Sequence, residues 1–204
     1  MKFCTVIVSR SKSCSIKTLH SVLRLNMLCI NNGFQNEIVY VNDNPYEKVE
    51  MIKNCLSRCD RLFFIDFGIN VDEGSLTQLF RKDEGIGVLV FPGVTEGIDW
   101  GLFRHKVTNN YKEPVSQMGL NFDTEVGPKI SDDIYKVKKT DAKAWVMFSK
   151  NVNKKCKKFV PSRMFESMME QGVKIYAYTA SKLIMTYTHE CVSSILNSAG
   201  VKAN

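Results

Sequence analysis

The chain has 204 residues, of which 44% are hydrophobic and 24% charged, and it carries a formal net charge of +7. A chain of this length suits one domain that needs no disulfide or metal for stability, and its composition excludes disordered, collagen-like and fibrous proteins. No apolar run approaches the roughly 20 residues that span a membrane, and a strand-like segment begins at Phe3 in place of a secretory signal. We therefore expect a soluble protein of the cytoplasm.

Apolar runs and helix-like stretches alternate through the first half of the chain. In the first of these helices, Leu19, Val22 and Leu23 recur near helical spacing. The pattern predicts strands at residues 3–8, 37–41, 62–65 and 87–91 and helices at residues 16–30, 46–59 and 76–80. This alternation is typical of βαβ units, so we expect an α/β fold with a mostly parallel central sheet and helices on both faces.

The second half of the chain is less regular. Residues 96–133 are rich in Gly, Asn, Asp and Pro and are predicted to form long loops with short strands. Strands are predicted at residues 142–148 and 173–177, and helices at residues 162–171 and 191–196. Because no repeat or linker interrupts the chain, we expect a single domain over residues 1–204.

The seven cysteines are scattered without a close pairing pattern. This usage suits reduced thiols in a cytosol-like compartment better than a disulfide framework. Cys55 and Cys59 are four residues apart, but no second pair lies at zinc-finger spacing, so we expect them to be buried structural residues.

Polar segments directly follow three of the predicted strands, namely Ser9-Arg10, Asn42-Asp43 and Asp66-Phe67-Gly68. Ligands of such sheets bind beyond the carboxyl ends of the strands, which makes these segments candidate binding residues. The chain has neither the Gly-x-Gly-x-x-Gly signature after its first strand nor a Gly-x4-Gly-Lys-Ser/Thr loop. If nucleotide phosphates bind here, we expect a divalent cation to neutralise them.

The stretch from Leu62 to Leu76 runs from an apolar strand into Asp66 and then into a helix start. It resembles the Asp-x-Asp region of GT-A glycosyltransferases, with Asp66 at the first acidic position. Gly68 stands where the second acid belongs, and Asn70 or Asp72 could substitute for it. The resemblance implies the Rossmann-like GT-A fold and an Mn²⁺ or Mg²⁺ ion on Asp66 that bridges the donor's diphosphate. The alternative is that Asp66 only caps a turn.

Other segments of the first half also resemble the GT-A pattern. Val8-Ser9-Arg10 corresponds to the loop that lies against the nucleotide, and Asp43 to the acid that contacts the base or ribose. Together with Asp66-Phe67-Gly68, these residues form the donor site that the resemblance implies. It also implies a nucleotide-sugar-binding half at residues 1–92 and a loop-rich acceptor-side half at residues 93–204.

The second half resembles the acceptor-side region of the same family. Residues 141–147 are similar to its acceptor-side strand, and residues 163–176 to the acidic helix, glycine stop and strand that follow. The family often carries its catalytic carboxylate at the start of that helix, where Arg163 occupies one usual acidic position and Glu166 is the nearest carboxylate. His189 follows the last strand, where many GT-A enzymes supply a histidine to the metal. A purely structural role is the alternative for His189.

The segment from Gly93 to Gly101, together with the small size and Lys-rich composition, is similar to glycosyltransferases encoded by large algal viruses, which would act in the host cytoplasm. Within it, Glu96, Asp99 and Trp100 are candidate acceptor residues, because carboxylates bond sugar hydroxyls and an indole face covers a pyranose ring. Asp99 is also the second candidate for the catalytic base. The alternative is that Trp100 fills the core and Asp99 caps a turn.

These features predict a metal-dependent glycosyltransferase that moves a sugar from a nucleotide-diphosphate donor, a UDP-sugar, to a hydroxyl of a glycan or protein. Gly68 and Arg163 favour the alternative of a catalytically silent nucleotide- or sugar-binding module of a larger assembly. Nine lysines at residues 136–158 could also attract nucleic acid. That third interpretation is disfavoured because no recognised binding motif accompanies them.

Overall fold

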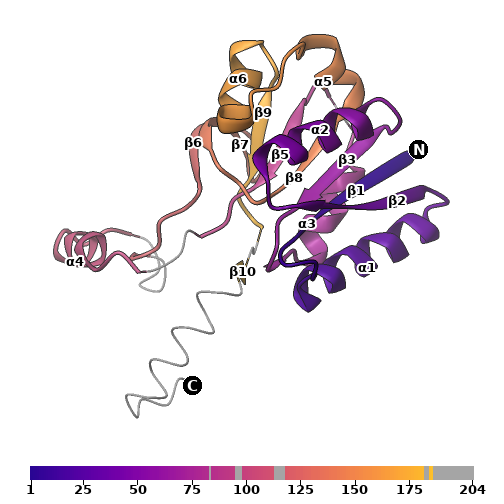
Figure 1. Ribbon diagram of the computed structural model, residues 1–204. Helices are drawn as coiled ribbons and strands as arrows, with labels where there is room; N and C mark the ends of the chain where they lie inside the picture. The colour runs from indigo at the N-terminus through magenta and orange to yellow at the C-terminus, as the bar shows by residue number, and fades with distance from the viewer. Residues whose placement is uncertain (83, 95–97, 113–117, 182–183, 186–204) are drawn as a thin grey trace.

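Strands and helices alternate through the first half of the chain, as the sequence predicts. The computed structural model describes residues 1–82, 84–94, 98–112, 118–181 and 184–185 (Figure 1). In chain order the elements of this half are β1 (Lys2–Ser9), α1 (Ile16–Asn31), β2 (Gln35–Asn42), α2 (Pro45–Leu56), β3 (Arg61–Ile65), β4 (Ile69–Asn70), α3 (Glu73–Thr77), the 3-10 helix η1 (Gln78–Phe80) and β5 (Val88–Phe91).

The second half is more ordered than the sequence predicts. Its elements are α4 (Trp100–Thr108), β6 (Thr124–Ser131), β7 (Ile134–Thr140), β8 (Ala144–Phe148), α5 (Ser149–Lys155), η3 (Pro161–Arg163), α6 (Met164–Glu170), β9 (Ile175–Tyr178) and β10 (Ile184–Met185). The prediction of long loops over residues 96–133 is therefore wrong for α4 and for the eight-residue strand β6. The helix predicted at residues 191–196 lies outside the described residues.

Both missed elements lack the apolar periodicity on which sequence prediction depends. Helix α4 has no buried residue, and it extends away from the sheet in Figure 1. Strand β6 lies at the edge of the sheet and pairs, among the described strands, with β7 alone through an irregular register, and most of its residues are exposed. A related correction applies to α1, where Val22 is buried but Leu19 and Leu23 lie on the exposed side.

One eight-stranded sheet joins the two halves of the chain, in the order β2-β1-β3-β8-β5-β9-β7-β6. Strand β1 pairs parallel with β2 and β3, and β5 pairs parallel with β9. Strand β8 runs antiparallel to both β3 and β5, and β7 runs antiparallel to β9 and β6. The sheet is therefore mixed rather than mostly parallel in its pairings. A fully buried strand such as β8 is an apolar run in either direction, so its sequence does not reveal the reversal.

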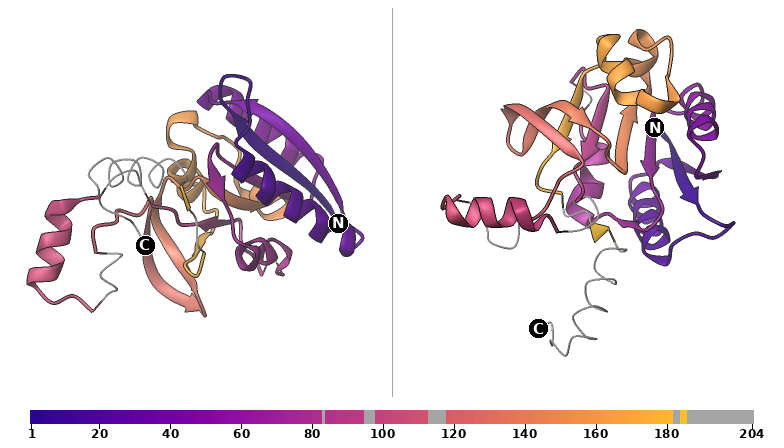
Figure 2. Two further views of the ribbon diagram at one scale, coloured as in Figure 1. Left: turned by 90° about the horizontal axis from the view of Figure 1, so that it is seen from below. Right: turned by 60° about the vertical axis from the view of Figure 1, so that its left-hand side comes forward.

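Helices cover both faces of the sheet, as predicted, and each face has its own hydrophobic cluster. Along β1, Cys4, Val6 and Val8 belong to one cluster while Phe3 and Ile7 belong to the other, because successive side chains of a strand point to opposite faces. Helices α2, α5 and α6 pack on the first face, and α1 and α3 on the second (Figures 1 and 2).

The described cysteines are free thiols, and all of them except Cys14 are buried, in agreement with the expectation for Cys55 and Cys59. Among the described helices, none combines the length and the apolar character needed to cross a membrane.

Two stacked rings sit where β3 meets β8. The rings of Phe64 and Trp145 are nearly parallel, with centroids 4.6 Å apart, and Phe165 of α6 meets Trp145 edge-on at 5.9 Å. All three side chains are buried. These contacts anchor α6 to the sheet.

We expect Trp145→Ala to lower the free energy of unfolding by about 3–5 kcal/mol, because it removes a buried indole and leaves a cavity. The other tryptophan, Trp100, is 62% exposed on α4, so Trp100→Ala should cost much less. Urea unfolding followed by circular dichroism measures both variants. Equal losses for the two substitutions would contradict the structure.

Candidate functional site

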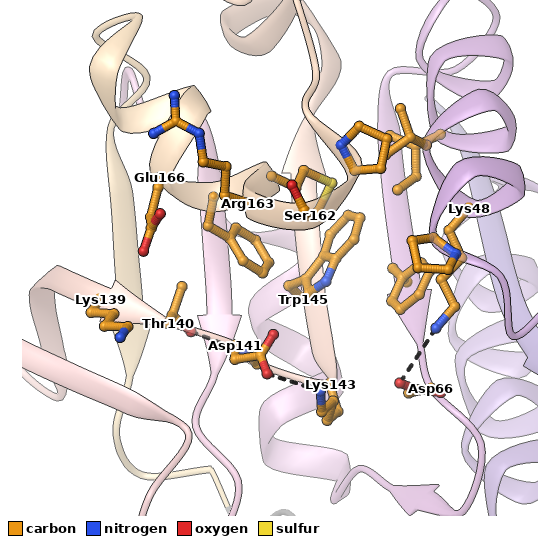
Figure 3. A pocket seen from close by; sticks show the side chains of 18 residues that line it. Lys48, Asp66, Lys139, Thr140, Asp141, Lys143, Trp145, Ser162, Arg163 and Glu166 are labelled. Carbon is orange, nitrogen blue, oxygen red and sulfur yellow. Dashed lines mark hydrogen bonds and ion pairs between the residues drawn. The ribbon is translucent and has the colours of Figure 1, made fainter.

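A pocket of about 410 Å³ lies between α2 and the η3–α6 segment, above the sheet. Its floor includes the stacked rings of Phe64 and Trp145. Lys48 and Asp66 lie on one side of it, and Arg163 and Glu166 on the other (Figure 3). The pocket therefore brings together residues from both halves of the chain, which are far apart in the sequence.

Four charged side chains meet at the carboxyl ends of β1, β2 and β3, beside this pocket. The Arg10 Nε–H donates to Asp43 Oδ2 over 2.8 Å, and the Lys48 ammonium donates to Asp43 Oδ1 over 2.5 Å. The same Lys48 Nζ lies 3.9 Å from Asp66 Oδ2. We call these four residues the strand-end cluster. The three candidate segments of the sequence thus do converge, because parallel strands place their carboxyl ends at one edge.

Local folding places Lys48 in this cluster. Strand β2 ends next to Asp43, and Asn44 then caps α2 by accepting the backbone N–H groups of Tyr46 and Glu47. Pro45 occupies the first helical turn, where its missing N–H costs nothing. Lys48 follows within the first turn of α2, so its side chain reaches back over the strand ends. No sequence pattern singled out Lys48, although its position in the helix that directly follows a candidate strand end was an available signal.

Hydrogen bonds and a cation–π contact hold the segment after β3. Asp66 Oδ1 accepts the backbone N–H of Phe67 over 2.7 Å, and the Asp66 N–H donates to the Lys143 carbonyl over 2.8 Å. The Arg10 guanidinium lies over the Phe67 ring, 5.4 Å from its centroid. Gly68 has φ +81°, a left-handed conformation that favours glycine. Asp66 therefore caps the turn through its Oδ1, while its Oδ2 faces the Lys48 ammonium.

Val8 and Ser9 contribute to the site mainly through the backbone. Val8 is fully buried in the hydrophobic cluster on the α2 face. The Ser9 hydroxyl donates to the Val41 carbonyl over 3.2 Å, which ties the end of β1 to β2. Neither residue lines the pocket between α2 and the η3–α6 segment.

The residues of the strand-end cluster do not fit a resident divalent metal. Of the two acidic positions of the Asp-x-Asp-like segment, Asp66 fills the first, and Gly68 stands at the second without a side-chain ligand atom. One oxygen of Asp66 caps Phe67 and the other faces the Lys48 ammonium. Within the described parts of the chain, no three His, Cys, Asp or Glu side chains come together as they would around a metal. His189, the second predicted ligand, lies outside those parts.

The two candidate bases occupy different places. Glu166 is half-buried in the first turn of α6 and lines the pocket. Asp99 does not line it: its Oδ1 accepts the Leu102 N–H over 2.8 Å and caps α4, and this bond lowers the pKa of Asp99. A carboxylate with a lowered pKa is a weaker base. Arg163 is turned toward Glu170, with Nη1 and Oε1 2.9 Å apart.

The acceptor candidates beside Asp99 are only partly described. Trp100 is exposed at the start of α4 and does not fill the core. Its ring meets the Phe103 ring edge-on at 5.9 Å. Glu96 lies outside the described residues.

No protein-family model matches the chain, and no curated protein matches it in sequence. Its structure is similar to that of GalNAc-T7 in a crystal with UDP, GalNAc and Mn²⁺, with a TM-score of 0.52 and 12% identity. This match covers 89% of the chain but 43% of the GalNAc-T7 chain, so the protein spans less than half of that structure's length. A weaker match, with a TM-score of 0.45 and 11% identity, is the inositol-1-phosphate CTP transferase from T. maritima, which covers 100% of this chain and 98% of its own. At these identities the likeness concerns the fold alone.

The charges around Asp43 predict how it titrates. The hydrogen bond from Lys48 lowers the pKa of Asp43 most, partial burial raises it, and Arg10 lowers it further, with a net pKa below the usual value. Because the folded pKa lies below the unfolded one, this contribution to stability is complete above the unfolded pKa of about 3.9 and is lost as the pH falls through the folded value.

Carbon-detected NMR titration of the Asp43 carboxyl should therefore give a pKa below about 3.9, and Lys48→Gln should raise it. Lys53→Gln, on an exposed part of the same helix, is the matched control and should leave the value unchanged. An Asp43 pKa that is insensitive to Lys48→Gln would contradict the ion pair.

Proposed function

We propose that this chain is a glycosyltransferase that binds a nucleotide-diphosphate sugar at the carboxyl ends of β1, β2 and β3. The observation that carries the proposal is that one pocket is lined both by Lys48 and Asp66 of the strand-end cluster and by Glu166 (Figure 3). Its fold neighbour GalNAc-T7, a GT-A glycosyltransferase, was crystallised with UDP and GalNAc, which favours a UDP-sugar as the donor. The acceptor would be a hydroxyl of a glycan or protein.

Each part of the donor has a place in this arrangement. The nucleotide would lie against the Val8-Ser9-Arg10 segment and Asp43, and the diphosphate against Arg10, Lys48 and the Asp66-Phe67-Gly68 turn. The sugar would then extend into the pocket toward Glu166. The pocket volume is within the range of small-molecule sites.

The proposed reaction is substitution at the anomeric carbon. The bond from this carbon to the phosphate oxygen breaks, and its electron pair leaves with the nucleoside diphosphate. The acceptor oxygen forms the new bond and loses its proton. In an inverting reaction, Glu166 would take that proton as general base, because it lies at the pocket while Asp99 caps α4.

The sequence predicts an Mn²⁺ or Mg²⁺ ion at the donor's diphosphate, but the described residues around Asp66 do not fit one, so no step of the proposed reaction depends on a metal. Asp66 and His189 remain its predicted ligands, and a metal on Asp66 would have to displace the Lys48 ammonium from it. The viral origin and the host cytoplasm also remain predictions of the sequence.

Thermal unfolding with UDP, GDP and CMP tests the donor site. UDP at about 100 times its dissociation constant should stabilise the fold by about 2.7 kcal/mol, which raises the melting temperature by roughly 5–11 °C. GDP and CMP should give smaller shifts. Release of UDP from a UDP-sugar separates an enzyme from a silent module, because a binding module releases none. No shift with any nucleotide would refute the proposed donor site.

Glu166→Gln should lower kcat by about 10²–10⁴-fold while leaving the affinity for UDP unchanged, because it removes only the proton acceptor. Glu170→Gln, also on α6 but paired with Arg163, is the matched control and should keep most of the activity. Steady-state kinetics with calorimetric UDP binding measure both effects. An unchanged kcat in Glu166→Gln would assign the base to another residue.

A further inference from the structure

The position beside Asp66 is taken by an ammonium group in this protein. We propose that the fixed cations Lys48 and Arg10, rather than a divalent metal, bind the diphosphate of the donor through charge-assisted hydrogen bonds. This inference rests on the proposed donor site. It makes the transferase independent of metal ions, in contrast to the expectation from the Asp-x-Asp-like segment.

The ion pairs place Lys48 where a phosphate would need a positive charge. Its side chain is only 19% exposed, and its ammonium bridges Asp43 of the second strand end and Asp66 of the third. The capped start of α2 fixes the backbone from which it extends. Lys48 lines the pocket (Figure 3) and its ammonium also bonds Asp43, so it would lie between the proposed nucleotide and sugar positions.

Arg10 supplies a second cation from the opposite side of Asp43. Its Nε–H is bonded to Asp43, and its guanidinium stacks over the Phe67 ring, so the planar group is held at the end of β1. The Arg10 side chain is 50% exposed and therefore open to a ligand from solvent. A guanidinium has five N–H donors in a fixed fork that matches phosphate oxygens. Because the Arg10 Nε–H is bonded to Asp43, its terminal N–H groups and the Lys48 ammonium would supply the phosphate contacts.

The same geometry disfavours a divalent ion on Asp66. An ion about 2.1 Å from Asp66 Oδ2 would lie within about 6 Å of the Lys48 ammonium, and like charges at that distance repel. Gly68 supplies no side-chain oxygen to a metal, and its φ of +81° is a backbone conformation that favours glycine. At the Asp66-Phe67-Gly68 turn, the chain therefore offers a single carboxylate, that of Asp66. This carboxylate is paired with the Lys48 ammonium.

Calorimetric binding of UDP to the whole chain, in EDTA and in Mn²⁺, tests the inference directly. We expect the dissociation constant in EDTA to lie within about threefold of that in Mn²⁺. In EDTA, Lys48→Gln should weaken the affinity for UDP by at least about tenfold, since the substitution removes one charged contact with the phosphate. Lys48→Arg should restore most of the affinity, and Lys53→Gln should behave as the unchanged protein.

Comparing the binding of uridine with that of UDP distinguishes a phosphate contact of Lys48 from a purely structural role. Because uridine has no phosphate, Lys48→Gln should leave its affinity unchanged while UDP binding falls. Equal weakening of both ligands would overturn the inference by showing that Lys48 only supports the site. If Lys48→Gln fails to fold, the EDTA comparison on the unchanged protein and the Lys48→Arg variant decide the question.

The outcomes distinguish this inference from the proposed function. UDP binding that requires Mn²⁺ overturns the role of Lys48 and Arg10 as the metal's replacement and leaves the donor site intact. Absence of binding by UDP, GDP and CMP in both conditions overturns the inference together with the donor site.

Discussion

The antiparallel insertion of β8 between β3 and β5 is the constraint on which the site depends. Trp145 pairs with Phe64 of β3 on one side and with Val90 of β5 on the other. Just before β8, the Lys143 carbonyl accepts the Asp66 N–H, so this ladder also fixes the turn that carries Asp66. Because β8 is buried on both faces, it cannot shift without exposing apolar surface. The second half of the chain is thereby held against the strand ends of the first.

The strand-end cluster is balanced, with two cations and two carboxylates in fixed positions. Asp43 holds Arg10 on one side and Lys48 on the other, while Asp66 faces Lys48 from the next strand. Charges that are already oriented need little reorganisation when a charged ligand arrives, which is how a polar site favours charge development during a reaction. The carboxylates thus act as supports for the cations.

Sequence patterns located the strand ends correctly but not the groups that complete the site. Arg10, Asp43 and Asp66 could be predicted to converge because apolar runs reveal strands and parallel strands share an edge. Lys48 could not be distinguished from other helical lysines, since its role depends on which carboxylates the fold brings within reach. Helix α4 was missed because none of its residues is buried, so no apolar stripe marks it.

The sequence by itself determined the α/β class, the first three strands and the polar segments that follow them, because these depend on local hydrophobic patterning and turn residues. Only the tertiary structure decided the direction of β8, the placement of Glu166 opposite Asp66 across one pocket, and the pairing of Lys48 with two carboxylates. The physical reason is that strand direction and long-range ion pairs arise from contacts between residues distant in the chain. No local pattern of residue types encodes those contacts.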